Sequence, residues 1–299
     1  MSSEQLASSE QLTLADMPTR LFSCTPSRLA AFDCPRRYRF TYLDRPTPPR
    51  GAPWAHNTVG AVAHLALHQW WSLPRAHRTP DEGASLVERN WQPHGFRDDV
   101  QSNAACAATA GWVRDYLSDR ATSAVDPAAE PIGVERTVAT RTAKLAVSGR
   151  VDRIDERGDE LVVVDYKTGR RPLDADDARG SQALALYVLG VRRTLRRDCR
   201  RVELHHLPTG TVAAFEHTDA SLERHLERAE HTAQDIVAAT DTLAAGADAD
   251  DVFPAAPGPG CSWCDFRAAC PEGRSTSAER EPWSGLADPA GGGAAGVIG

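Results

Sequence analysis

Residues 149–169 constrain the fold of this 299-residue chain more than any other stretch. They predict two strands, near 143–155 and 161–167, joined by a tight turn over 156–160. Side chains alternate between the two faces of a strand, so Asp165 and Lys167 point the same way and Tyr166 points opposite. Asp152 on the partner strand is then expected to lie beside Asp165.

Two carboxylates beside an ammonium group stabilise a core poorly, but they suit a divalent cation and a positioned water. For an isolated Asp-x-Lys, the more common case is a surface hairpin with solvated charges. Here the apolar run from Leu161 to Val164 precedes Asp165. This run indicates a buried strand that delivers charge into a cleft, where the charge needs a partner or a function.

Composition is that of an ordinary globular protein, with 41% hydrophobic and 25% charged residues. No apolar run reaches the roughly 20 residues that span a bilayer, and residues 1–19 do not resemble a secretory signal, so the cytoplasm is the expected location. The net charge is −7, yet arginines gather at 20–50 and at 192–201 while acidic residues gather at 216–251. A local basic face is what phosphate contacts require, although solvated arginines explain the second cluster equally well.

The pattern along the chain predicts an α/β protein. Helices are expected from Thr25-Pro26 and near 58–71, 82–91, 99–120, 178–197 and 219–244, with further strands near 132–140, 201–207 and 211–216. The predicted organisation is a flexible lead (1–19), a helical N-terminal region (20–125), an α/β core (126–244), a linker with a cysteine-rich segment (245–274) and a disordered tail (275–299).

Three cysteines lie close together near the C-terminus, at Cys261, Cys264 and Cys270. Three thiolates at this spacing imply a metal, and a tetrahedral centre needs a fourth ligand, for which Cys34 is the best remote candidate. Spacing alone favours zinc. The other cysteines have no partner spacing and are expected to be ordinary thiols: Cys24, Cys106 and Cys199.

These motifs together resemble the PD-(D/E)xK nuclease superfamily, in particular its RecB-like exonuclease branch. In that branch a GxxD strand precedes a DYKTG-type strand, as at 149–152 and 165–169 here, and a GxxxH motif before the core matches Gly60 and His64. The resemblance implies a restriction-endonuclease-like α/β core, a mixed central sheet flanked by helices, with a helical N-terminal cap.

The resemblance also implies site roles. His64, Asp152, Asp165 and the carbonyl of Tyr166 would bind Mg²⁺ or Mn²⁺, and Lys167 would orient or activate the attacking water. His68, one helical turn after His64, is not given this role.

Three further positions need separate comment. Tyr187, on the helix after the core, is expected to keep its role in the family's site and to help guide a strand into the cleft. Gln182 stands five residues before it instead of the usual four, so Ala183 holds the expected glutamine position. Glu135, before the central strands, could touch the metal site, although a surface ion pair is the more common case.

Iron–sulfur members of this branch, such as the AddB nuclease domains, place one cysteine before the core in an F-x-x-C-P-x-x-Y context. Phe32, Cys34, Pro35 and Tyr38 match that context, except that Phe32 stands two residues before the cysteine. The resemblance therefore implies a [4Fe–4S] cluster, with zinc as the alternative. Its ligands would be Cys34, Cys261, Cys264 and Cys270.

The expected function is a divalent-metal-dependent DNA exonuclease in repair or recombination. It would act on single strands or duplex ends, with a separate helicase as a further partner and no membrane. Arg36, Arg37, Tyr38 and Arg39 are predicted to guide the DNA. Two alternatives stay open: a non-catalytic DNA-binding or helicase-associated module with this fold, and a CRISPR-type or phage-defence nuclease.

Overall fold

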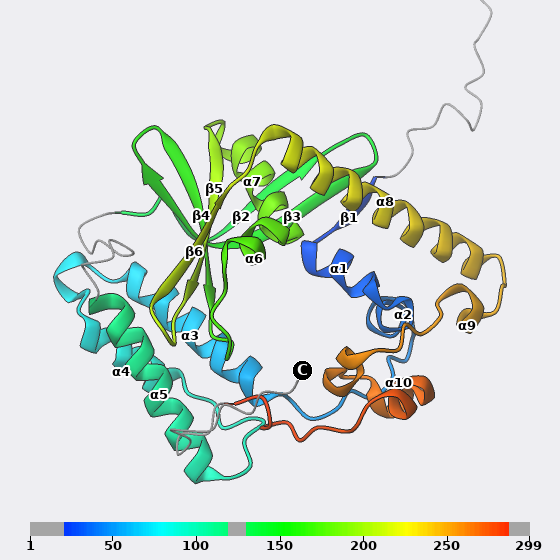
Figure 1. Ribbon diagram of the computed structural model, residues 1–299, viewed down its shortest axis with the longest axis horizontal. Helices are drawn as coiled ribbons and strands as arrows, with labels where there is room; N and C mark the ends of the chain where they lie inside the picture. Colours follow the sequence, from blue (N-terminus) through cyan, green and yellow to red (C-terminus); the bar gives the residue numbers. More distant parts are fainter. Residues whose placement is uncertain (1–20, 119–129, 287–299) are drawn as a thin grey trace, which may run out of the picture.

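A computed structural model describes residues 21–118 and 130–286 (Figure 1). The predicted lead and the last part of the predicted tail lie outside these ranges. Within them, the centre of the molecule is a six-stranded mixed sheet. Its strands are β1 (Phe22–Cys24), β2 (Gly133–Arg141), β3 (Leu145–Arg157), β4 (Glu160–Lys167), β5 (Cys199–His206) and β6 (Thr211–Glu216).

The long strand β3 organises this sheet. Along one edge it pairs with β2 in antiparallel fashion. At its other edge, its first residues pair in parallel with β1 and its last residues pair in antiparallel fashion with β4. β4 then runs parallel to β5, and β5 and β6 form an antiparallel pair. The predicted mixed central sheet flanked by helices is confirmed.

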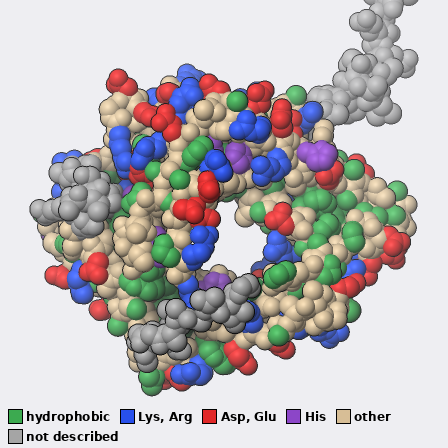
Figure 2. Space-filling model, in the orientation of Figure 1, with side chains coloured by type: hydrophobic (Ala, Val, Ile, Leu, Met, Phe, Trp, Pro, Cys, Tyr) green, Lys and Arg blue, Asp and Glu red, His purple; other side chains and the backbone are tan. Residues whose placement is uncertain are grey.

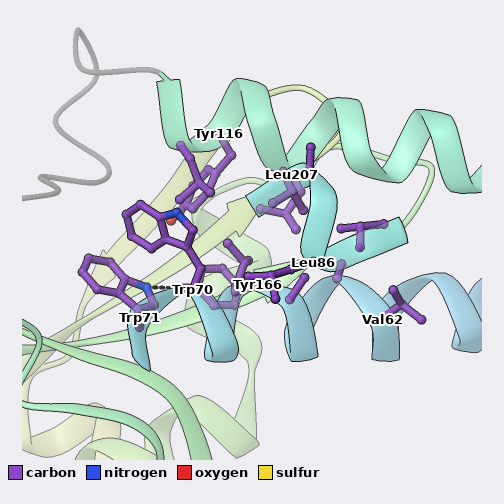
Figure 3. Close-up of a cluster of buried hydrophobic side chains, with 14 of the residues drawn as sticks. Val62, Trp70, Trp71, Leu86, Tyr116, Tyr166 and Leu207 are labelled. Carbon is purple, nitrogen blue, oxygen red and sulfur yellow. Dashed lines mark hydrogen bonds between the residues drawn. The ribbon is translucent and has the colours of Figure 1, made fainter. Parts of the chain in front are cut away.

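Helices α3 (Ala55–Ser72), α4 (Pro80–Asn90) and α5 (Asp99–Ser118) cover one face of the sheet (Figure 1). Val162, Val164 and Tyr166 of β4 point into this layer because every second residue of a strand faces the same side. Figure 3 shows Tyr166 among the aromatic side chains of α3 and α5, which include Trp70 and Tyr116. The cluster anchors the middle of β4 from behind.

The opposite face packs on α6 (Ala175–Gly180) and α7 (Gln182–Leu195), with α8 (Asp219–Ala244) beyond them. A single helix was expected over 178–197, but Ser181 ends one helix and caps the next, accepting a hydrogen bond from the Leu184 N–H. Strand β1 is also absent from the prediction, because three residues are too few to show the alternation of apolar and polar side chains that indicates a strand. It adds part of the predicted helical N-terminal region to the sheet.

Short elements complete the described part of the molecule: α1 (Pro26–Ala30), η2 (Ala31–Asp33), α2 (Pro35–Tyr42), η3 (Arg75–His77), α9 (Ala249–Val252), η4 (Pro259–Trp263), η5 (Arg267–Ala269) and α10 (Pro271–Thr276). Residues 277–286 run from α10 back to α3, where the Pro282 carbonyl accepts a hydrogen bond from the Ala55 N–H at 3.1 Å. The predicted disordered tail is therefore wrong for 275–286, because these residues pack against the N-terminal part of α3.

This return path gives the molecule a ring-like outline. Figure 2 shows an opening through its centre, with acidic and basic side chains on the rim. In Figure 1, α1 and α3 lie on different sides of this opening, with the sheet above it. Within residues 21–118 and 130–286, no helix combines the length and apolarity needed to cross a lipid bilayer.

Candidate active site

A cavity with about 1180 Å³ of empty space lies between the start of α1, the middle of α3, strands β2 and β3, and α7. It is open to solvent. His64, Glu135, Asp152 and Tyr187 line it, and each comes from a different element. The sheet, a helix of each flanking layer and the N-terminal segment therefore meet at one wall.

His64 is held by contacts to both central strands. Its Nε2 lies 3.1 Å from the carbonyl oxygen of Tyr166 and its Nδ1 lies 3.3 Å from Oδ2 of Asp152. The same Oδ2 accepts a hydrogen bond of 2.8 Å from the Tyr166 N–H. Burial opposes a charge on His64, but the hydrogen bond and the charge of Asp152 outweigh it and raise its pKa.

Asp165 and Lys167 lie on the face of β4 opposite Tyr166. Their side chains form an ion pair, with Nζ and Oδ2 2.5 Å apart. Burial raises the pKa of Asp165, Lys167 opposes that rise and Asp152 adds to it. The Lys167 side chain remains 42% exposed, so it can reach a substrate oxygen. The chain uses arginine 32 times and lysine only twice, here and at Lys144.

Tyr166 fixes the backbone between these two charged residues. Its hydroxyl accepts hydrogen bonds from Arg153 at 3.1 Å and from the indole N–H of Trp71 at 3.4 Å. The ring is 2% exposed. Because both ends of Tyr166 are held, its carbonyl stays directed at His64.

Tyr187 lies directly over the glycine of the GxxD segment. A Cβ atom at Gly149 would stand 2.4 Å from Cε1 of Tyr187, far inside a normal contact distance. Burial raises the pKa of Tyr187 to about 12, with further increases from Asp165 and Asp152. Gln182 does not face the site; its side chain donates to the carbonyl of His225 at 3.3 Å. The five-residue interval accounts for this turn away.

We expect Gly149→Ala to lower the rate of strand hydrolysis about tenfold or more, because the new methyl group must displace the Tyr187 ring from the cavity wall. Initial rates on a labelled single strand would measure this. Ser148→Ala, at the exposed neighbouring position, is the matched control and should retain the rate. A Gly149→Ala protein with unchanged rate would show that the Tyr187 position does not matter.

The donor groups at this wall fit a hard divalent cation. His64, Glu135 and Asp152 each bring one ligand atom to a group in which all three atoms lie within 4.8 Å of one another. Carboxylate oxygens suit Mg²⁺ and Mn²⁺, and an imidazole nitrogen is accepted more readily by Mn²⁺. Asp165 lies beside this group, paired with Lys167, and the Tyr166 carbonyl lies beside His64. The predicted ligands thus converge on one place, together with Glu135.

The predicted DNA contacts on α2 are not available at the surface. Tyr38 is fully buried, and Arg36 and Arg39 are 6% and 7% exposed. Arg36 pairs with Glu272 at 2.7 Å, and Arg39 pairs with Asp250 at 2.8 Å. These two arginines therefore bind the C-terminal segment instead of a phosphate.

The other predicted contact, Arg37, is also engaged within the protein. It is half-buried and donates to the carbonyl of Ala30 at 3.1 Å. The second arginine cluster, near 192–201, is largely paired as well, for example Arg197 with Glu156 at 2.6 Å and Arg200 with Asp219 at 3.2 Å. The arginines named here are therefore engaged within the protein and do not form a free basic face.

A second cavity lies where α2 meets the C-terminal segment, with about 350 Å³ of empty space. All four predicted cluster ligands line it: Cys34, Cys261, Cys264 and Cys270. Backbone N–H groups point at three of their sulfurs, from Ala256 to Cys34 at 3.5 Å, from Gly258 to Cys261 at 3.4 Å and from Gly273 to Cys270 at 3.4 Å. Such donors favour thiolates.

Comparison with known proteins places the chain in a family. The profile of the PD-(D/E)XK nuclease superfamily matches residues 23–271, and the chain belongs to that superfamily. No curated protein matches it. Among solved structures, one described as a "Putative exonuclease" from Eubacterium rectale is 12% identical over 77% of this chain and 86% of its own, with a TM-score of 0.47. The structure of SSO0001 is 14% identical over 58% and 75%, with a TM-score of 0.29.

Family membership supports nuclease activity, and the two structural likenesses are too distant to add to it. The assignment therefore rests on the family profile and on the site itself. In that site Asp152 lines the larger cavity, and Asp165 and Lys167 form an ion pair on the neighbouring strand β4.

Proposed function

We propose that this chain is a divalent-metal-dependent DNA exonuclease of the RecB-like type, acting in DNA repair or recombination. One observation carries the proposal: Asp152 and His64 line a solvent-open cavity, and the ion pair of Asp165 and Lys167 lies on the adjacent strand. The molecule also has an opening through its centre (Figure 2). An opening bounded by the protein favours a strand that enters end first, and a separate helicase would supply that strand.

The residues of the site divide the work of hydrolysis. His64, Asp152, Asp165 and the Tyr166 carbonyl would hold a Mg²⁺ or Mn²⁺ ion, which supplies Lewis-acid polarisation of the scissile phosphate and lowers the pKa of a bound water. Lys167 donates hydrogen bonds to the attacking water and to the phosphate oxygens, where negative charge grows in the transition state. Asp165 orients the Lys167 ammonium through their ion pair.

Entry through the opening predicts a dependence on free ends. We expect a linear labelled single strand to be degraded with Mg²⁺ or Mn²⁺, and a closed circle of the same sequence to resist degradation at least a hundredfold longer. Gel analysis over time distinguishes the two substrates. The same circle, made linear by a single cut, serves as the control substrate. Cleavage of the closed circle at the linear rate would contradict the exonuclease assignment.

We further propose that Cys34, Cys261, Cys264 and Cys270 bind one [4Fe–4S] cluster. All four sulfur-bearing side chains line one cavity, and backbone N–H groups lie near three of the sulfurs. Hydrogen bonds to the sulfurs are a feature of protein iron–sulfur sites, and this arrangement supports the proposal. The cluster would then join α2 to the segment that follows α9.

Anaerobic purification tests this second proposal. We expect a brown protein that absorbs near 400 nm with about four irons per chain. Cys264→Ser should lose both the colour and most of the iron, and it should unfold at a lower temperature because the C-terminal segment loses its attachment. Cys106→Ser, a half-buried thiol on α5, is the matched control and should keep its iron. A colourless wild-type protein with one zinc would overturn the iron assignment.

A further inference from the structure

Glu135 stands out in strand β2 because its backbone φ is +49°, in the left-handed region. Residues other than glycine, asparagine and aspartate rarely adopt this conformation, and they keep it only where the surroundings enforce it. The ladder between β2 and β3 pairs Val134 with Arg153 and Arg136 with Val151, so Glu135 falls opposite Asp152. The unusual backbone angle therefore occurs at the metal-binding wall.

The side chain of Glu135 is committed to that wall. It is 15% exposed, and one of its oxygens belongs to the group of three donor atoms with His64 and Asp152. Its present partner is Arg150, whose Nε lies 2.5 Å from Oε2. Arg150 itself is 70% exposed and lines the same cavity. A buried carboxylate thus faces a cation that is free to move.

We propose that Glu135 is an additional metal ligand. We further propose that Arg150 leaves Glu135 when the metal binds and then contacts the DNA strand. A cation held by His64, Glu135 and Asp152 would take over the carboxylate that Arg150 now neutralises. The released guanidinium would then bind a backbone phosphate of the incoming strand. The inference rests on the proposed metal-dependent function and adds to it a coupling between metal binding and substrate binding.

Titration of the protein with Mn²⁺ in the absence of DNA, followed by calorimetry, tests the ligand role. We expect Glu135→Gln to weaken Mn²⁺ binding at least tenfold, because the neutral amide is a poor ligand. Arg150→Gln should tighten binding severalfold, because the competing cation is gone. In the double variant the benefit of Arg150→Gln should disappear. The Lys144–Glu230 ion pair lies outside the cavity, and Lys144→Gln is the matched control with unchanged affinity.

The substrate role of Arg150 needs a second readout. In a Lys167→Ala background, which blocks turnover, the affinity for a labelled single strand is measured against salt concentration. With Mn²⁺ present, Arg150→Gln should reduce the salt slope by about 0.7, the value of one phosphate contact on a single strand. Without Mn²⁺, the slope should not change, because Arg150 is engaged by Glu135.

The outcomes separate this inference from the proposed function. Equal Mn²⁺ affinities of the wild-type and Glu135→Gln proteins would overturn only the role of Glu135 as a ligand. A salt slope that Arg150→Gln changes equally with and without Mn²⁺ would overturn the exchange. Wild-type protein that binds no Mn²⁺ and hydrolyses no strand would overturn the proposed function and this inference with it.

Discussion

Lys167→Ala is expected to reduce the rate of strand hydrolysis about a thousandfold while the protein remains folded and continues to bind DNA. The Lys167 ammonium pairs with Asp165 at 2.5 Å, and its side chain is exposed enough to reach the phosphate. Removal of one preorganised donor to a developing negative charge costs about 10²–10³ in rate. Loss of its role in activating water adds to this cost.

The side chain's shape matters as well as its charge. Lys167→Arg should recover little of the lost rate, since a planar guanidinium cannot occupy the place of a compact ammonium beside a buried carboxylate. Lys144→Ala removes the only other lysine of the chain and should retain the wild-type rate. Single-turnover hydrolysis and thermal unfolding of each variant provide the measurements. Hydrolysis by Lys167→Ala within tenfold of wild type would remove Lys167 from the mechanism.

Much of the core could be predicted from the sequence because its signals are local. The alternation in β4 places Tyr166 in the core and Asp165 with Lys167 on the other side, and the structure has this arrangement. The apolar run before Asp165 correctly indicates a buried strand. The mixed sheet follows from the order of strands and helices. Each of these inferences uses residues within one or two neighbouring elements.

The errors arise where distant segments meet. Arg36 and Arg39 read as free basic residues, but their partners Glu272 and Asp250 stand more than 200 residues later in the chain. Only the folded protein brings those carboxylates to α2. The same return of the C-terminal segment to α3 explains why 275–286 are not a disordered tail.

For Glu135 the sequence favours a surface ion pair over a contact with the metal site, and the structure shows an ion pair with Arg150. Its sequence neighbourhood, Val134-Glu135-Arg136, reads as an ordinary strand with two solvated charges. The left-handed φ that turns the residue is not encoded by a glycine or an asparagine and comes from tertiary contacts. The GxxD and DYKTG segments could therefore identify the site's position, but they left Glu135 open between a metal contact and a surface ion pair.

The site also depends on a buried polar network behind β4. Arg153 is 1% exposed; its guanidinium donates to Asp155 at 2.8 and 2.9 Å and to the hydroxyls of Tyr116 and Tyr166 at 3.1 Å. His205 lies on the far side of Tyr116, 2.7 Å from its hydroxyl. This network links β3, β4, β5 and α5 beneath the residues that face the cavity.

Arg153→Met should therefore lower the free energy of unfolding by about 3–5 kcal/mol, since it leaves the Asp155 carboxylate without its main partner in a largely buried site. It should also lower the hydrolysis rate at temperatures where the variant is folded, because Tyr166 loses the donor that helps to fix its carbonyl near His64. Denaturant unfolding and single-turnover rates on the same samples would measure both effects.

Two further variants separate the network from general destabilisation. Arg114→Met removes an exposed ion pair between Arg114 of α5 and Asp81 of α4, and it should change the unfolding midpoint little. Arg153→Lys keeps the charge but lacks the guanidinium fork, so its stability should lie between wild type and Arg153→Met. If Arg153→Met lost stability but kept the wild-type single-turnover rate, the network would serve the fold alone, and the Tyr166 carbonyl would be held sufficiently by Asp152 and the β4–β5 ladder.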